Sequence, residues 1–234
     1  MQCTSMVHVN QDKHGWLRMI DAGGKPITLA LVADGISLGF EGKYASYNTV
    51  KCLMEWAAEY FMSTPFDAQS AAEEISALLA DCNHRLNEFS EMNSDKDTCC
   101  TVCGMITDES QTLIFNAGDS RVYELSSDRG VRCMTQDDIA EDGYSIAMHI
   151  GGKEDDGITV SFSQERFRAD GSYLICTDGM YRRLRFEEWL TELCDVADSE
   201  AAVELLRDMT EQLRADGETD DITGIILAGS KANG

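Results

Sequence analysis

The chain reads Leu29-Ala30-Leu31-Val32-Ala33-Asp34-Gly35 in its first third and Tyr173-Leu174-Ile175-Cys176-Thr177-Asp178-Gly179 in its last third. In each segment an apolar strand runs directly into Asp-Gly. Such a strand places a carboxylate just beyond the edge of a sheet, while the glycine lets the backbone turn and leaves its carbonyl open to a ligand. If the two strand ends meet, they form an oxygen-rich pocket suited to hard divalent cations.

The Asp-Gly dipeptide alone mostly marks turns. Only Asp34 and Asp178 directly follow long apolar runs, so from these two positions a metal site and a pair of turns are both open interpretations. The same dipeptide also begins at Asp142, Asp156, Asp170 and Asp216.

The composition limits the class of protein. A chain of 234 residues with 43% hydrophobic residues and two prolines is expected to form an ordered core, and we expect one domain over residues 1–234. The formal charge of −23 comes from 42 acidic and 19 basic side chains. That charge would repel nucleic acid and anionic membranes, so neither is an expected partner. Most of these charges are expected to be a solvated surface, and the rest would attract divalent cations or basic polypeptides.

Several features predict a cytoplasmic location. No segment approaches the roughly 20 consecutive apolar residues of a membrane span, and residues 1–10 lack the pattern of a secretory signal. Nine cysteines without such a signal indicate reduced thiols. The one dense group, Cys99, Cys100 and Cys103, lacks the spacing of a zinc site and is expected to be apolar strand residues.

The periodicity of apolar residues predicts strands and helices that are segregated along the chain. Helices are expected from near Glu41 to about Phe61, over 67–91 with Asp67 as N-cap, over 186–194 and over 199–215. Strands are expected at 6–10, 16–20, 27–33, 98–107, 112–116, 121–125, 131–134, 158–162, 172–177 and 222–228. Hairpin turns fit residues 108–110, 118–120 and 127–130. This order favours an α+β fold, with helices covering the outer faces of packed sheets.

Four acidic sites from distant parts of the chain lie at strand ends. Asp12 follows a short apolar strand, Asp34 and Asp178 end longer ones, and Asp220-Asp221 precedes the last strand. If these carboxylates converge without cations, their repulsion raises their pKa values and opposes folding. Divalent ions would remove that conflict, and several carboxylates with bridging waters match a two-metal centre.

Motifs in the first half of the chain resemble those of the metal-dependent protein serine/threonine phosphatases of the type 2C (PPM) family, especially the short bacterial form. Asn10-Gln11-Asp12 is similar to the family's opening Asn-Glu/Gln-Asp motif. Val32-Ala33-Asp34-Gly35, followed by Gly42-Lys43-Tyr44-Ala45-Ser46, resembles its second motif, Asp-Gly-Met-Gly-Gly-His…Gly-Glu-x-Ala-Ser.

The second half of the chain continues the resemblance in family order. Asn116-Ala117-Gly118-Asp119-Ser120-Arg121 closely matches the family's Asn-x-Gly-Asp-Ser-Arg hairpin. Thr177-Asp178-Gly179 corresponds to its Ser-Asp-Gly, and Asp220-Asp221-Ile222-Thr223 corresponds to its Asp-Asn-Ile-Thr. The match covers nearly the whole chain, and the ordered set is more specific than any single Asp-Gly.

The resemblance implies a four-layer α/β/β/α sandwich of two antiparallel sheets flanked by helix pairs, with two Mn²⁺ or Mg²⁺ ions at one end. By position, Asp34 would bridge the two metals and the Gly35 carbonyl would complete one shell. Asp178 and Asp220 would hold one ion, and Asp12 would act on the other. Asp119 matches a ligand of a weaker third metal, although a turn aspartate paired with Arg121 explains it equally well. The choice of Asp220 over Asp221 rests on motif alignment alone.

The function implied is hydrolysis of phosphoserine and phosphothreonine in proteins by a metal-bridged hydroxide, with Asp34 and Asp12 as catalytic residues. A phosphorylated protein substrate and a cognate serine/threonine kinase are the expected partners. Two cations would neutralise the phosphate, orient it and acidify the attacking water.

The chain departs from the family pattern at several positions. An arginine that grips the substrate phosphate is replaced by Val7, with Lys13, Arg18 or Lys43 as candidate substitutes. A histidine that protonates the leaving group falls at Gly39. The flap is shortened to residues 136–150, and Asp97-Thr98-Cys99 replaces the family's Gly-Thr-Thr. General acid catalysis is typically worth about 10²- to 10⁴-fold, so a slow enzyme is compatible with these changes.

Two alternatives follow. The first is a weakly active or inactive pseudophosphatase that binds a phosphoprotein or a kinase partner. The second is an aspartate-nucleophile phosphatase, which would need Asp-x-Asp after a strand. It fits less well, because Asp34-Gly35-Ile36 has no second aspartate.

Overall fold

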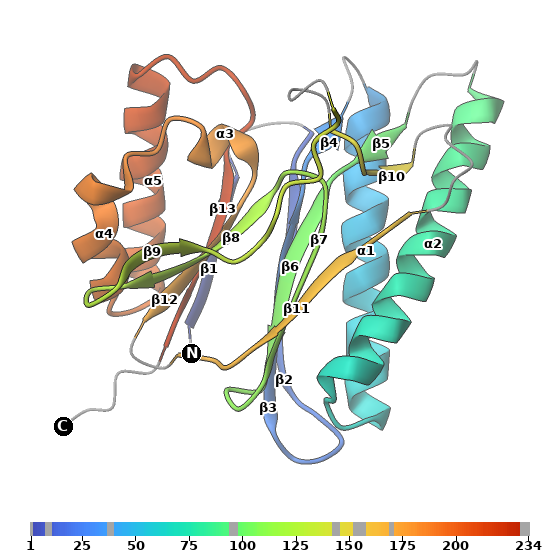
Figure 1. The fold of residues 1–234 in the computed structure, drawn as a ribbon, viewed down its shortest axis with the longest axis horizontal. Helices are drawn as coiled ribbons and strands as arrows, with labels where there is room; N and C mark the ends of the chain where they lie inside the picture. The colour runs from blue at the N-terminus through green and yellow to red at the C-terminus, as the bar shows by residue number, and fades with distance from the viewer. Residues whose placement is uncertain are drawn as a thin grey trace.

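Two five-stranded antiparallel sheets face each other at the centre of the computed structural model (Figure 1). The structure describes residues 2–7, 11–36, 40–93, 98–141, 146–151, 158–168 and 171–229, with the backbone alone for 2–7 and 40. The order of the first sheet is β1 (Gln2–Val7), β13 (Thr223–Ala228), β12 (Ser172–Cys176), β8 (Arg121–Ser126) and β9 (Gly130–Cys133). The order of the second is β11 (Ser161–Glu165), β7 (Thr112–Ala117), β6 (Val102–Thr107), β3 (Pro26–Ala33) and β2 (Lys13–Ile20).

Helices cover both outer faces of the sandwich (Figure 1). The helices α1 (Phe40–Ser63) and α2 (Ala68–Met92) pack on the β2–β3–β6–β7 side, and α4 (Phe186–Asp195) and α5 (Ser199–Ala215) pack on the other sheet. A single-turn helix, α3 (Asp178–Tyr181), follows β12. A small sheet of β10 (Ile150–Gly151), β5 (Cys99–Cys100) and β4 (Gly35–Ile36) lies near the start of α1. The α+β four-layer sandwich expected from the sequence is confirmed.

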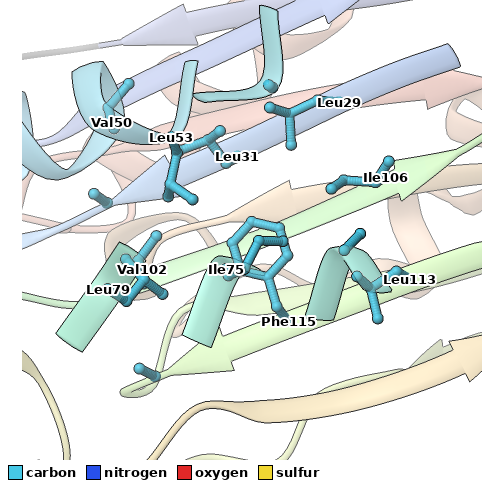
Figure 2. Packing of buried hydrophobic residues seen from close by; sticks show 14 of the residues in the cluster. Leu29, Leu31, Val50, Leu53, Ile75, Leu79, Val102, Ile106, Leu113 and Phe115 are labelled. Carbon is cyan, nitrogen blue, oxygen red and sulfur yellow. The ribbon is translucent and has the colours of Figure 1, made fainter. Parts of the chain in front are cut away.

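The uninterrupted apolar run of β3 has a direct structural cause. Leu29 and Leu31 project into the core under α1 and α2, whereas Ala30 and Val32 project into the core between the sheets. Side chains of a strand alternate between its two faces, so a strand that is covered on both faces must be apolar throughout. Figure 2 shows the helix-side core, in which Phe115 of β7 lies among side chains of β3, β6 and both helices.

The second helix begins where its sequence indicated. The Asp67 side chain accepts a hydrogen bond from the Ser70 backbone N–H at 2.9 Å and so caps the amino end of α2. The buried face contains Ile75, Leu79 and Leu86, which follow the predicted spacing of three and four residues.

The segment 118–120 was expected to be a hairpin turn, and this expectation is wrong. It carries the chain from β7 in one sheet to β8 in the other, so the two strands are not paired. Gly118 permits the crossing, because its φ of +113° is unfavourable for a residue with a side chain. The turns at 108–110 and 127–130 do join paired strands.

Other strand boundaries also differ from the expectation. The strand expected over 98–107 is two strands in two sheets, because Thr101 leaves the ladder to bond Asp34. The strand expected at 158–162 is β11 and begins at Ser161. The elements β4, β10 and α3 were not predicted, since two to four residues show no periodicity.

Several predicted features fall partly or wholly outside the description. Residues 8–10, Gly39 and Asp97 lie outside the described residues, as does the side chain of Val7. In the predicted flap, the described residues 136–141 and 146–149 contain no helix. Within the described ranges, no helix has the length and apolar character needed to cross a bilayer. No two of the eight cysteines whose side chains are described form a disulfide.

The helix-side core gives a test of stability. Leu53→Ala in α1 removes a fully buried side chain and should lower the free energy of unfolding by about 2–5 kcal/mol. Met62→Ala, in the same helix but 67% exposed, should change it by about 0.5 kcal/mol or less. Urea denaturation measures both, and equal effects would contradict this assignment of the core.

Candidate metal centre

Five segments bring acidic side chains to one end of the sandwich. Asp12 immediately precedes β2, Asp34 joins β3 to β4, and Asp178 begins α3 directly after β12. Asp220-Asp221 precedes β13, and Asp119 lies in the crossing from β7 to β8. In Figure 1, α3 and β4 mark this end of the two sheets. The predicted convergence of these chain segments is therefore what the fold produces.

Asp34 is held in place through its backbone. Its N–H donates to Thr101 Oγ1 at 3.2 Å, and its carbonyl accepts from the Thr101 N–H at 2.8 Å. Thr101 Oγ1 also lies 2.8 Å from Ser120 Oγ, which ties this strand end to the Asp119 segment. These bonds involve only the backbone of Asp34, so they do not engage its carboxylate, which lies beside the other acidic side chains.

Asp12 is almost completely buried, at 1% exposure. Its Oδ2 accepts from Thr177 Oγ1 at 2.8 Å, while its Oδ1 has no partner. Burial raises the pKa of Asp12 to about 6, although the hydrogen bond from Thr177 opposes the shift. Thr177 therefore orients this carboxylate and leaves one oxygen for a ligand.

The pKa values of Asp34 and Asp178 are also raised. Burial, followed by the charges of Asp12 and Asp178, raises the pKa of Asp34 well above its usual value. Burial, followed by the charge of Asp119, raises the pKa of Asp178 to about 7. Charge repulsion and burial both oppose full ionisation of this cluster.

Arg182 bridges two of the predicted metal ligands. Its guanidinium forms an ion pair with Asp178 and lies 3.1 Å from Asp220 Oδ2. The Arg182 side chain is 52% exposed, whereas the Asp178 side chain is 6% exposed. One cationic side chain thus offsets part of the negative charge of the pair that the sequence assigned to one ion.

Asp119 has an environment that the sequence did not indicate. It does not pair with Arg121, whose guanidinium instead makes two hydrogen bonds with Asp137 at 2.9 and 2.6 Å. The expectation of an Asp119–Arg121 pair is therefore wrong. Asp119 is 6% exposed, its Oδ1 has no partner, and burial raises its pKa. Its carbonyl accepts from the Tyr181 hydroxyl at 2.9 Å, which fixes it beside α3.

The two glycines that follow Asp34 and Asp178 lie against backbone. A β-carbon on Gly35 would overlap Gly42, and one on Gly179 would overlap the Asp221 carbonyl. Glycine at these positions is thus required for close packing of the chain. This requirement holds whether or not the Gly35 carbonyl also has a role at the site. The Gly179 contact brings Asp220-Asp221 beside α3.

Asp220 and Asp221 both face the cluster, from different sides. Asp220 contacts Arg182 and acts on the pKa of Asp34 and Asp178. Asp221 Oδ2 accepts from the Gln11 N–H at 2.9 Å, and its charge acts on Asp12. Asp220 and Asp178 contact the same guanidinium, that of Arg182, and the assignment of Asp220 over Asp221 as a ligand stays a prediction.

The chemistry of this cluster fits hard divalent cations. Buried oxygens of Asp12, Asp119 and Asp178 have no hydrogen-bond partner, and carboxylate oxygens are the ligands that Mg²⁺ and related ions prefer. Across the described residues, no three His, Cys, Asp or Glu side chains are already arranged to hold an ion. The Arg182 bridge accounts for this at Asp178 and Asp220, where a cation would have to displace a guanidinium.

Thr177, Arg182 and Tyr181 were missed as parts of the site. In the sequence, Thr177 is recognisable only as part of the Thr-Asp-Gly motif. Its contact with Asp12 joins residues 165 positions apart, and no local pattern predicts such a contact. Arg182 follows Asp178 by four residues, which is the spacing of neighbours on a helix. The four-residue spacing is visible in the sequence, but it indicates a contact only if a helix of four residues is predicted there.

This sandwich with an acidic centre at one end has the architecture of the type 2C phosphatases that the motifs resemble. The chain belongs to the protein phosphatase 2C family, because the family model described as "Protein phosphatase 2C" matches residues 6–217. It is therefore an enzyme of the serine/threonine phosphatase class. No curated protein matches the chain.

Solved structures of bacterial phosphatases share the fold at low identity. PppA, described as a key regulatory component of T6SS in Pseudomonas aeruginosa, superposes with a TM-score of 0.78 at 20% identity, over 97% of this chain and 96% of its own. Stp1 from Staphylococcus aureus gives 0.78 at 17% identity, over 98% and 95%. The catalytic domain of PstP, in complex with two manganese ions, gives 0.73 at 20% identity, over 96% of each chain.

The raised pKa of Asp178 predicts a pH dependence of stability without metal. The folded state keeps a proton that the unfolded chain loses near pH 4, so this contribution is lost as the pH rises through about 7. In chelator, the unfolding free energy of the wild type should fall relative to Asp178→Asn between pH 5 and 8. One pKa unit corresponds to about 1.4 kcal/mol, so the relative fall should be on the order of a few kcal/mol.

Asp108→Asn is the matched control for this measurement. Burial opposes ionisation of Asp108, but hydrogen bonds from Gln111 and Lys25 hold its pKa at about 2. Its contribution is lost only as the pH falls below about 4, so the difference between Asp108→Asn and the wild type should be constant from pH 5 to 8. A rise of the wild-type unfolding free energy relative to that of Asp178→Asn over that range would contradict the predicted direction of the pH dependence.

Proposed function

We propose that this protein hydrolyses phosphoserine and phosphothreonine in other proteins with two Mn²⁺ or Mg²⁺ ions held by the acidic cluster. The observation that carries the proposal is the convergence of Asp12, Asp34 and Asp178, with raised pKa values and unpartnered buried oxygens. The cluster has more acidic than basic side chains, since Arg182 is the cation that contacts Asp178 and Asp220. Membership of the phosphatase 2C family supports metal ions as the further source of positive charge. The two manganese ions of the PstP structure support the same assignment.

Each ligand has a proposed role. Asp34 would bridge the two ions, aided by the Gly35 carbonyl, and Asp12 would serve one of them. Asp178 and Asp220 would hold the other, and Asp119 would contribute to a third, weaker position. When bound, the ions would supply positive charge for the phosphate and acidify a water molecule.

The chain's own residues prepare this site. Thr177 orients Asp12 so that Oδ1 is left for a ligand, and Thr101 fixes the backbone of Asp34. Arg182, whose side chain is half exposed, contacts both Asp178 and Asp220 and would compete with an ion for these two carboxylates.

The partner would be a phosphorylated protein together with the serine/threonine kinase that modifies it. We further propose one catalytic domain over residues 1–234 and a cytoplasmic location. The family acts on phosphoproteins, and PppA is described as a regulatory component in its own system.

A second candidate is a weakly active member whose main role is to bind a phosphoprotein or kinase partner. The Arg182 bridge favours it, because Asp178 and Asp220 already have a cationic partner within the protein. Binding of a phosphoprotein that is equal with manganese and with chelator, without turnover, would support this second candidate over the first.

Replacement of the proposed bridging ligand tests the main proposal. Asp34→Asn should reduce Mn²⁺-stimulated hydrolysis of a phosphothreonine peptide by about 10²-fold or more, a loss typical of removing a preorganised electrostatic group. Asp208→Asn, which removes an exposed carboxylate on α5, is the control and should leave the rate unchanged. Absence of hydrolysis by the wild type across metals and phosphoproteins would refute the enzymatic proposal.

Competition between Arg182 and metal gives a separate prediction. Arg182→Ala should tighten Mn²⁺ binding by up to about fivefold in calorimetry, because a half-exposed ion pair is worth about 1 kcal/mol or less. Arg183→Ala is the matched control, since Arg183 bonds the Asp216 carbonyl and Glu218 rather than the cluster. Weaker binding in Arg182→Ala than in Arg183→Ala would show that Arg182 supports the ion instead of competing with it.

A further inference from the structure

Two cysteines line one cavity between the helices of one outer layer, and the proposed phosphatase chemistry uses neither of them. The cavity has a volume of about 160 Å³ and lies between α1 and α2, which run side by side (Figure 1). Cys52 belongs to α1 and Cys82 to α2. We refer to these two residues as the dithiol pair.

The packing of the two helices places the dithiol pair at the same level. The short connection 64–67 makes the helices antiparallel, and Tyr44 near the start of α1 stacks on Phe89 near the end of α2, with ring centroids 3.9 Å apart. Cys52 follows Tyr44 by eight residues and Cys82 precedes Phe89 by seven, which correspond to about 12 Å and about 10.5 Å of helix. The two cysteines therefore lie opposite each other, two turns from the stacked rings.

Each thiol of the pair has the other as the largest influence on its pKa. Cys82 lowers the pKa of Cys52, although burial opposes this shift. Cys52 raises the pKa of Cys82, and burial adds to that shift. Exposure differs in the same sense, because Cys82 is 3% exposed whereas Cys52 is partly exposed. One thiol of the pair thus ionises more readily than an ordinary cysteine, and the other less readily.

A guanidinium lies beside the pair. Arg85, which also lines the cavity, donates from Nη2 to Cys82 Sγ at 3.9 Å, and its charge lowers the pKa of Cys52. Arg85 is also paired with Asp81 at 2.5 Å, and Glu55 opposes ionisation of Cys52 from the α1 side. Positive charge near a partly exposed thiol favours the thiolate, which is the nucleophilic form.

Three cysteines of the strands have the opposite character. Cys100, Cys103 and Cys176 are completely buried, and burial raises the pKa of each thiol. Buried cysteines of this kind behave as small apolar residues and are chemically inert. The dithiol pair differs from them, because Cys52 is partly exposed and both of its members line a cavity.

We propose that Cys52 and Cys82 form a reactive dithiol site, which a hydroperoxide converts into a disulfide between α1 and α2. Cys52 is the attacking thiol, because it is the more exposed of the two and has the guanidinium of Arg85 nearby. Cys82 is the resolving thiol. A partly exposed thiol that ionises readily next to a second cysteine is the arrangement typical of reversible thiol oxidation.

The reaction with hydrogen peroxide has two steps. The Cys52 thiolate attacks one peroxide oxygen, so that an S–O bond forms, the O–O bond breaks, and the hydroxide that leaves takes up a proton to become water. The Cys82 thiol then loses its proton and attacks the Cys52 sulfur, so that the S–S bond forms and the S–O bond breaks with release of a second water. The two thiols together lose two electrons, and the peroxide is reduced to two water molecules.

Oxidation of the reduced full chain in chelator tests the proposal without phosphate hydrolysis or metal. A small molar excess of hydrogen peroxide is added, the remaining thiols are alkylated, and the intact mass is measured. The product should lose the mass of two hydrogen atoms and two alkylation sites, and peptide mapping should find Cys52 linked to Cys82. Dithiothreitol should restore both thiols. Absence of an internal link, or a link between other cysteines, would overturn the proposal.

Single substitutions separate the two roles. Cys52→Ala should abolish the link and leave Cys82 reduced, whereas Cys82→Ala should abolish the link and leave Cys52 as a sulfenic acid that dimedone traps. Cys133→Ala is the matched control, because Cys133 is an exposed cysteine outside the cavity, and it should keep the link. Equal loss of the link in all three variants would contradict the site, and dimedone trapping of Cys82 in Cys52→Ala would contradict the assignment of Cys52 as the attacking thiol.

Discussion

The convergence of like charges at one end of the sandwich is the constraint on which the site depends. Asp12, Asp34 and Asp178 are brought together by strands that must stay paired for the core to exist, so the carboxyl groups cannot separate to lower their repulsion. Their pKa values rise instead, and the Arg182 guanidinium offsets part of the negative charge. A hard cation would supply more positive charge, so the proposed metal chemistry would be a consequence of how the chain folds.

The fold that enforces this convergence follows from strands covered on both faces. In β3, alternate side chains enter the helix-side core and the inter-sheet core, and the strand then ends at Asp34. In β12 and β13 the same arrangement ends or begins at Asp178 and Asp220-Asp221. The burial of the strands and the position of the carboxylates at their ends are thus two aspects of one pattern, because the acidic side chains lie where the apolar runs stop.

Much of this was predictable from local patterns. These patterns each concern a single element. They are the apolar runs at 27–33 and 172–177, the three- and four-residue spacing of α2, and the Asp67 cap of that helix. Local patterns do not predict which strands pair or which side chains meet, because these contacts join segments far apart in the chain. The residues 118–120 have the composition of a hairpin turn, yet they join two sheets. The partner of Arg121 is Asp137 and not its neighbour Asp119, and Thr177 contacts a residue near the other end of the chain.

The Arg182 bridge also bears on how the protein matures. A cluster of buried carboxylates without counter-charge would make folding wait for metal. Here the guanidinium joins Asp178 and Asp220 within the polypeptide itself. Part of the repulsion is therefore offset by the protein itself, and if the proposed ions bind, the sandwich would not depend on them alone to bring these carboxylates together.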